Sequence, residues 1–204
     1  MTRFAIQAMA ALAVTMLVST AAMAQNEPVL GTKLPLADRS MPSSNGNSQR
    51  LADLAGPNGT VVLFWSNNCP WVDKYEDRLS ETVSRFSQAG FGFVLVNSND
   101  PVAFPEEAID GIRERASSRN YTVPYLLDEG SQLAKALGAV RTPHVYVFDG
   151  SGGLVYSGAI DDSPGDPADV TETFLVSVLG SMSNGQKASV TRTTSFGCRI
   201  KAVQ

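Results

Sequence analysis

Residues 60–65 form an unbroken apolar run, Thr-Val-Val-Leu-Phe-Trp, directly after Pro57-Asn58-Gly59. The run is rich in β-branched and aromatic residues, and it shows no alternation between apolar and polar positions. A strand with this pattern is buried on both faces, which is typical of the centre of a sheet that helices cover. The run therefore predicts an α/β fold.

A helix is expected next, because Pro70 suits the first helical position and apolar residues then recur at near-helical spacing until Gly90. The next segments are, in order, a strand at 91–96, a charged helix at 106–119, a short strand at 121–127 and a short helix at 132–137. Two strands at 145–148 and 154–156 flank an Asp/Gly turn and predict a hairpin. A helix from about 169 to 179 completes a mixed central sheet flanked by helices.

The first 24 residues have the layout of a secretory signal peptide. An apolar stretch from Phe4 to Met23 ends in the small-x-small pattern Ala22-Met23-Ala24. We expect cleavage after Ala24 in preference to retention as a membrane anchor, so the mature protein would be periplasmic or secreted and would have no contact with the membrane.

The remaining chain fits one domain with two additions. Residues 25–58 are rich in Pro, Gly, Ser and Asn and predict an N-terminal extension with a hairpin and a short turn at 51–54. Residues 59–183 form the expected domain. Residues 184–204 form a polar C-terminal tail that carries Cys198.

Charge and composition exclude several classes of function. The chain has 16 basic and 20 acidic residues, and the basic ones are scattered, which argues against a nucleic-acid partner. One histidine and two distant cysteines do not supply a metal-ligand set, and no Gly-rich phosphate loop follows a strand. We therefore expect no metal and no cofactor.

Cys69 stands at the junction between the buried strand and the expected helix. Free N–H groups at a helix start and the helix dipole favour the thiolate form of such a cysteine. Ser66 could donate its hydroxyl to the same sulfur. The alternative is that Cys69 is a small buried hydrophobic residue; its polar neighbours favour the reactive interpretation.

Several sequence motifs together resemble those of the thioredoxin-like superfamily, in its peroxiredoxin-like or redoxin branch (alkyl hydroperoxide reductase/thiol-specific antioxidant). Phe-Trp at 64–65 with Cys-Pro at 69–70 is similar to the strand-to-active-site phrase of exported thioredoxins. The Thr-Pro segment at 140–149, the hairpin at 150–162 and the Gly-Cys-x-Ile-Lys ending at 197–201 are similar to parts of the same branch.

The resemblance implies a thioredoxin-like fold and a set of substrate-binding residues. Pro143 would be cis, against the base rate for X-Pro bonds, and would leave the Thr142 backbone open to an extended substrate segment. Trp71 would form part of the rim around the sulfur. His144 could move protons and Arg141 could favour a thiolate, although both could equally be surface residues.

The chain departs from the usual Cys-x-x-Cys pair. In one register Cys69 is the nucleophile and Val72 replaces its partner; in the other, Ser66 replaces the first cysteine. We prefer the first register, in which Ser66-x-x-Cys69 resembles the peroxidatic motif of peroxiredoxins. The proline usual before that motif is absent, since Val62 occupies its place.

The function expected from these residues is that of a thiol-disulfide oxidoreductase or a peroxiredoxin-like peroxidase with Cys69 as nucleophile. Its substrate would be a peroxide or a protein disulfide, and an external thiol would reduce it. Cys198 could resolve the sulfenic acid formed on Cys69. Alternatively, a permanent Cys69–Cys198 disulfide would stabilise a non-catalytic binding module.

Overall fold

The computed structural model describes residues 27–203, so the expected signal peptide lies outside the described residues. Its centre is a five-stranded sheet in the order β5-β4-β3-β7-β8. β3 and β5 are parallel to β4, whereas β7 is antiparallel to both β3 and β8. The strands are β3 Gly59–Trp65, β4 Phe91–Asn97, β5 Tyr125–Leu127, β7 His144–Asp149 and β8 Leu154–Gly158. The mixed sheet confirms the predicted α/β class.

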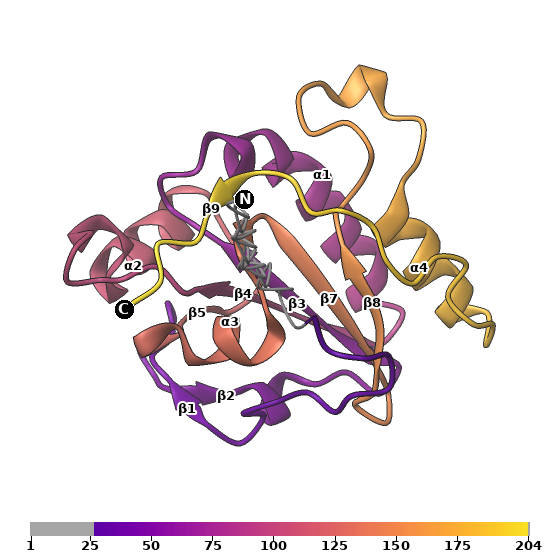
Figure 1. Ribbon diagram of the computed structural model, residues 1–204, viewed down its shortest axis with the longest axis horizontal. Helices are drawn as coiled ribbons and strands as arrows, with labels where there is room; N and C mark the ends of the chain where they lie inside the picture. Colours follow the sequence, from indigo (N-terminus) through magenta and orange to yellow (C-terminus); the bar gives the residue numbers. More distant parts are fainter. Residues whose placement is uncertain (1–26, 204) are drawn as a thin grey trace, which may run out of the picture.

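Four helices lie around this sheet (Figure 1). They are α1 Pro70–Ser87, α2 Ile109–Ser118, α3 Gln132–Leu137 and α4 Phe174–Ser183. α1 begins where expected, because Pro70 lacks an N–H and occupies a position where no intrahelical donor is needed. α1 therefore holds Cys69 at a fixed point, one residue before the helix.

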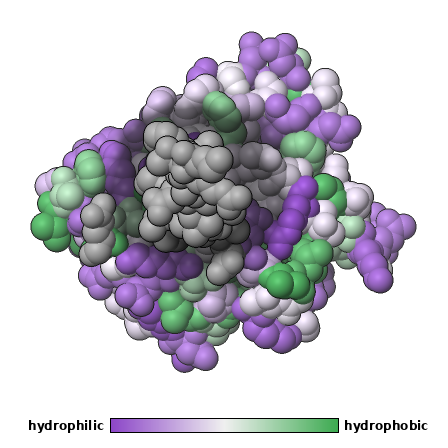
Figure 2. All heavy atoms as spheres, viewed as in Figure 1, coloured by the Kyte–Doolittle hydropathy of each residue, from purple (hydrophilic) through white to green (hydrophobic). Residues whose placement is uncertain are grey.

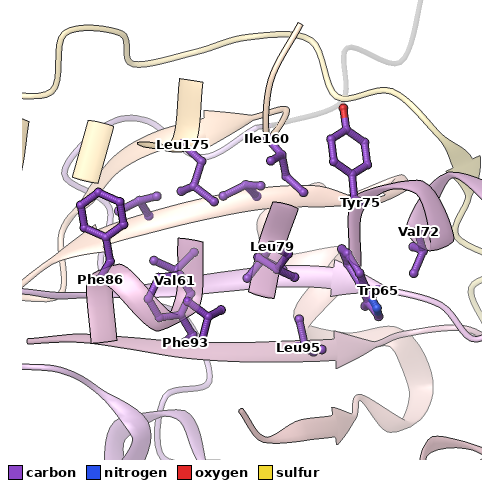
Figure 3. Close-up of a cluster of buried hydrophobic side chains, with 14 of the residues drawn as sticks. Val61, Trp65, Val72, Tyr75, Leu79, Phe86, Phe93, Leu95, Ile160 and Leu175 are labelled. Atoms are coloured by element: carbon purple, nitrogen blue, oxygen red, sulfur yellow. The ribbon is translucent and has the colours of Figure 1, made fainter. Parts of the chain in front are cut away.

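The buried strands contribute side chains to two separate hydrophobic clusters, one on each face of the sheet. Alternate residues of β3, such as Leu63 and Phe64, belong to opposite clusters, as the two-residue period of a strand requires. On one face, the side chains of α1 pack against those of β3 and β4 (Figure 3). The pattern explains why the central strand is apolar at every position.

The opposite face is covered by α3 and by the N-terminal extension. The extension contains a small antiparallel hairpin, β1 Ser40–Met41 and β2 Gln49–Arg50, followed by the 3₁₀ turn η1 Leu51–Leu54. Met41 and Leu51 are buried in the cluster of this face. The hairpin and the turn at 51–54 agree with the interpretation of the sequence.

The C-terminal tail runs from α4 across the open edge of the sheet and ends near α2 (Figure 1). We call residues 191–203 the strap. At the β8 edge, the Ser157 N–H donates to the Thr191 carbonyl and the Ser157 carbonyl accepts from the Thr193 N–H. The strap then forms β9, Cys198–Arg199, which pairs antiparallel with β6, Arg141–Thr142. The strap thus carries Cys198 from the far end of the chain to the loop before β7.

Two helices begin later than the sequence predicts. Residues 105–107 form the 3₁₀ turn η2, Ala108 is extended, and α2 starts at Ile109 instead of 106. Residues 167–169 likewise form the 3₁₀ turn η4, and α4 starts at Phe174. The strand expected at 121–127 is limited to 125–127. In the first case the break turns a glutamate, Glu107, into the interior, where it is fully buried.

Hydrophilic side chains dominate the face drawn in Figure 2, with hydrophobic ones in small separate groups. Large hydrophobic residues that are exposed in the described part are scattered along the chain; they are Val29, Leu30, Leu36, Val102 and Phe196. Among residues 27–203, none of the helices has the length and apolar character that crossing a bilayer requires.

The central strand yields a test of the core. Leu63 is fully buried, so we expect Leu63→Ala to lower the free energy of unfolding by about 2–5 kcal/mol, through lost apolar burial and the cavity left behind. Val102→Ala, at an exposed position, should change it by less than about 0.5 kcal/mol. Urea unfolding followed by circular dichroism measures both. Equal effects would contradict the assignment of the core.

Candidate active site

The structure brings the two cysteines together. Cys69 occupies the N-cap of α1, and its Sγ donates a hydrogen bond to the Thr142 carbonyl oxygen at 3.1 Å. Cys198 lies in β9 directly opposite Thr142 in the strand pairing. Both thiols are free. Thr142 therefore contacts both cysteines: its carbonyl accepts from the Cys69 thiol, and its backbone pairs with that of Cys198.

Cys69 is 1% exposed and belongs to the hydrophobic cluster of the α1 face. The expected hydrogen bonds from helix amides are not formed, since the Cys69 side chain makes no capping contact. Its sulfur faces a carbonyl and a second thiol. The docked structure therefore encloses Cys69 and directs its thiol to the Thr142 carbonyl.

Cys198 is half-buried. Burial, together with a smaller contribution from the interaction with Cys69, raises the pKa of its thiol to about 11. Cys198 consequently keeps its proton near neutral pH. A protonated thiol beside Cys69 is a hydrogen-bond donor for any charge that develops there.

Three residues predicted to bind substrate contact the strap. Arg141 donates from Nη1 to the Gly197 carbonyl at 2.9 Å. Trp71 packs edge-on against Phe196, with ring centroids 4.7 Å apart. The third, Thr142, pairs with Cys198 through its backbone. The strap occupies the backbone edge that an extended substrate segment would use.

Gly197 allows the strap to approach this closely. Its φ is +145°, and a Cβ added there would lie 2.0 Å from the Thr142 carbonyl oxygen. Only glycine tolerates both the backbone conformation and the contact.

The peptide bond between Thr142 and Pro143 is cis, as the family resemblance predicts.

The loop before Cys69 is held by Glu107. Ser66 donates its hydroxyl to Glu107 Oε1 at 2.6 Å, and the backbone N–H of Asn67 donates to Oε2 at 2.8 Å. The Ser66 hydroxyl is therefore engaged by a carboxylate, and the contact with the Cys69 sulfur that the resemblance implies stays a prediction.

His144 follows the cis-proline but does not face Cys69. It lies in β7 on the same side as Tyr146, with ring centroids 4.5 Å apart, whereas Val145 points into the cluster that contains Cys69. His144 is 1% exposed, and neither of its ring nitrogens has a hydrogen-bond partner in the structure. Burial lowers its pKa to about 3, so the ring is neutral at physiological pH.

Sequence reasoning missed the polar cluster centred on Glu107. The sequence predicts a charged helix at 106–119 and does not single out Glu107. A signal was present in Asn97-Ser98-Asn99, three polar residues directly after the strand expected at 91–96, at the carboxyl edge where sites of α/β folds gather. Within residues 27–203, no group of three or more His, Cys, Asp or Glu is arranged to hold a metal ion.

Comparison with known proteins identifies the family of this site. The model of the AhpC/TSA family matches residues 30–157, which is more than half of the chain. The chain belongs to the AhpC/TSA family. The matched segment includes Cys69 and the cis-proline, and it ends before the strap that carries Cys198.

Two solved structures are similar along most of the AhpC/TSA chain. A hypothetical protein from Sinorhizobium meliloti 1021 is 35% identical, with a TM-score of 0.79, and the match covers 87% of this chain and 97% of that one. An uncharacterized conserved protein from Geobacillus kaustophilus is 32% identical, with a TM-score of 0.80, over 86% of this chain and 93% of that one. No curated protein matches the chain.

A more distant structure shares the fold alone. Peroxidoxin BcpB from Mycobacterium tuberculosis is 16% identical, with a TM-score of 0.52, and the match covers 63% of this chain and 83% of that one. Together with the family match, these structures show that the fold is thioredoxin-like.

The fit of Gly197 yields a prediction about access to Cys69. In a Cys198→Ser background, Gly197→Ala should destabilise the docked strap and raise the alkylation rate of Cys69. Destabilisation of the docked state by about 1.4 kcal/mol makes opening about tenfold more frequent. The rate is measured with iodoacetamide and mass spectrometry.

Gly185→Ala is the matched control, because Gly185 also has a positive φ but no atom lies within 4 Å of an added Cβ. If both substitutions leave the alkylation rate unchanged, the strap does not control access to the sulfur.

Burial of His144 predicts a pH dependence of stability. The pKa of His144 falls from 6.5 to about 3 on folding. Between these two values, His144 binds a proton in the unfolded chain but stays neutral in the folded chain. Stability contributed by the neutral ring is present above pH 6.5 and is lost as the pH falls towards 3. His144→Phe should flatten the curve of unfolding free energy against pH in this window. An unchanged slope would contradict the burial of the ring.

Proposed function

We propose that this AhpC/TSA protein is a thiol peroxidase in which Cys69 is the nucleophile and Cys198 is the resolving thiol. The observation that carries the proposal is the pairing of Cys198 with Thr142, whose carbonyl accepts the hydrogen bond from Cys69. Family membership supports a thiol peroxidase or oxidoreductase. The placement of the second thiol supports the finer assignment.

In the first step, the Cys69 thiolate attacks the terminal oxygen of a hydroperoxide. The O–O bond breaks, Cys69 becomes a sulfenic acid, and the alcohol or water leaves after taking up a proton. The thiolate forms when Cys69 gives up the hydrogen bond to Thr142. The helix dipole of α1 favours the charged sulfur at the N-cap.

In the second step, Cys198 attacks the sulfenic sulfur. The new S–S bond releases the sulfenic oxygen as water, with the thiol proton of Cys198 completing the balance. Two equivalents of an external thiol then reduce the disulfide to the two starting thiols. Because β9 already holds Cys198 beside the site, the attack requires little rearrangement of the strap.

The docked strap favours a small peroxide over a protein disulfide as substrate. An extended polypeptide would need the backbone of Thr142, which β9 occupies. A small oxidant needs only a brief opening of the strap, whose Phe196 packs against Trp71 of α1. We also propose that the protein works in the periplasm or outside the cell, on the basis of the signal peptide that the sequence predicts at 1–24.

Two substitutions test the proposal. Cys69→Ser should reduce peroxide consumption to the uncatalysed rate, because the nucleophile is removed. Cys198→Ser should still consume about one equivalent of peroxide per chain in a single turnover and accumulate the sulfenic acid, since resolution is blocked. Peroxide is followed by a colorimetric assay, and the sulfenic acid is trapped with dimedone.

The alternative of a structural disulfide makes the opposite prediction. If the reduced protein consumes no peroxide and both cysteine substitutions lower the thermal unfolding temperature equally, the two sulfurs form a stabilising bridge. If a protein disulfide is reduced while peroxide is not consumed, the site is a disulfide reductase.

A further inference from the structure

Glu107 is a carboxylate that lies completely inside the protein and meets only donors. It is 0% exposed. Oε1 accepts from the Ser66 hydroxyl at 2.6 Å and from the Asn68 N–H at 3.3 Å. Oε2 accepts from the Asn67 N–H at 2.8 Å and from Asn97 Nδ2 at 2.6 Å. Four donors around two oxygens match the acceptor-only character of an ionised carboxylate.

One arm of this arrangement reaches the segment that carries Cys69. Three of the four donors belong to residues 66–68, the loop that joins β3 to Cys69. Backbone N–H groups of a short loop fix its path when they converge on one acceptor, and bonds to a charged acceptor are stronger than neutral ones. Glu107 therefore sets where the chain enters the N-cap of α1.

The other arm reaches the segment that carries Cys198. Asn97, which donates to Glu107, accepts through Oδ1 from the N–H of Asn99 at 3.0 Å and from its Nδ2 at 3.1 Å. Asn99 Oδ1 in turn accepts from the N–H of Lys201 at 2.8 Å, three residues after Cys198 in the strap. Asn97 and Asn99 are buried, so this chain of hydrogen bonds is shielded from water.

We propose that Glu107 is a positioning residue that fixes the two thiols relative to one another. Its hydrogen bonds go to neither sulfur, and it acts through the loop at 66–68 on one side and through Asn97 and Asn99 on the other. A role of Glu107 in catalysis rests on the proposed peroxidase function. Its effect on the formation of a disulfide between Cys69 and Cys198 does not depend on that function.

The substitution Glu107→Gln tests this claim with little change in side-chain size. Each carboxylate oxygen accepts two hydrogen bonds, so replacing either oxygen with an amide group leaves two donors without an acceptor. The measurement is the equilibrium between the protein dithiol with oxidised glutathione and the protein disulfide with two reduced glutathione molecules. This exchange balances atoms and electrons and needs no peroxide.

We expect Glu107→Gln to lower this equilibrium constant about tenfold, which corresponds to about 30 mV in the two-electron potential. Glu114→Gln, which removes an exposed carboxylate of α2, should leave the constant unchanged. If Glu107→Gln folds and its constant equals that of Glu114→Gln, the proposal is overturned. A purely structural role would lower the unfolding temperature without moving the potential.

Two further substitutions keep the test decisive if Glu107→Gln fails to fold. Ser66→Ala removes a donor from the Cys69 arm, and Asn99→Ala removes the acceptor of the strap arm. Each should lower the constant several-fold, and two unchanged constants would overturn the proposal. A wild type that shows the glutathione equilibrium but consumes no peroxide refutes the peroxidase function and leaves the role of Glu107 intact.

Discussion

The antiparallel contact between Arg141–Thr142 and Cys198–Arg199 is the interaction on which the site depends. It brings the C-terminal strap to the loop that contains the cis-proline, and it encloses Cys69 beneath the strap. Without this contact, the protein would present a single thiol at a helix start. With it, the same thiol has a carbonyl acceptor and a second thiol within the site.

The hydrophobic sheet and the polar carboxyl edge of that sheet have different tasks. The sheet fixes β3 and α1 through apolar packing that does not depend on direction. The carboxyl edge needs directional contacts, because loops there carry backbone donors that must be satisfied away from water. Two buried carboxylates meet this need. Glu107 accepts hydrogen bonds from the loop before Cys69, and Asp128 accepts from the N–H groups of Leu133 and Ala134 at the start of α3.

Much of the fold could be predicted because its signals are local. The unbroken apolar run gave the central strand, and the helical spacing after Pro70 gave α1 with its buried face. The start of α2 could not be predicted in this way. Glu107 belongs to a charged segment whose composition suits a solvated helix, and the donors supplied by residues 66–68 and by Asn97 make its burial favourable.

The sequence by itself determined the strand, the helix start and the place of Cys69 between them, since neighbouring residues specify these features. Only the tertiary structure decided that Cys198 lies opposite Thr142, that Arg141 holds the strap, and that His144 faces away from the thiols. These placements depend on contacts between residues far apart in the chain. Their free energy comes from packing and hydrogen bonds that exist only when the whole sheet, with its covering strap, has formed.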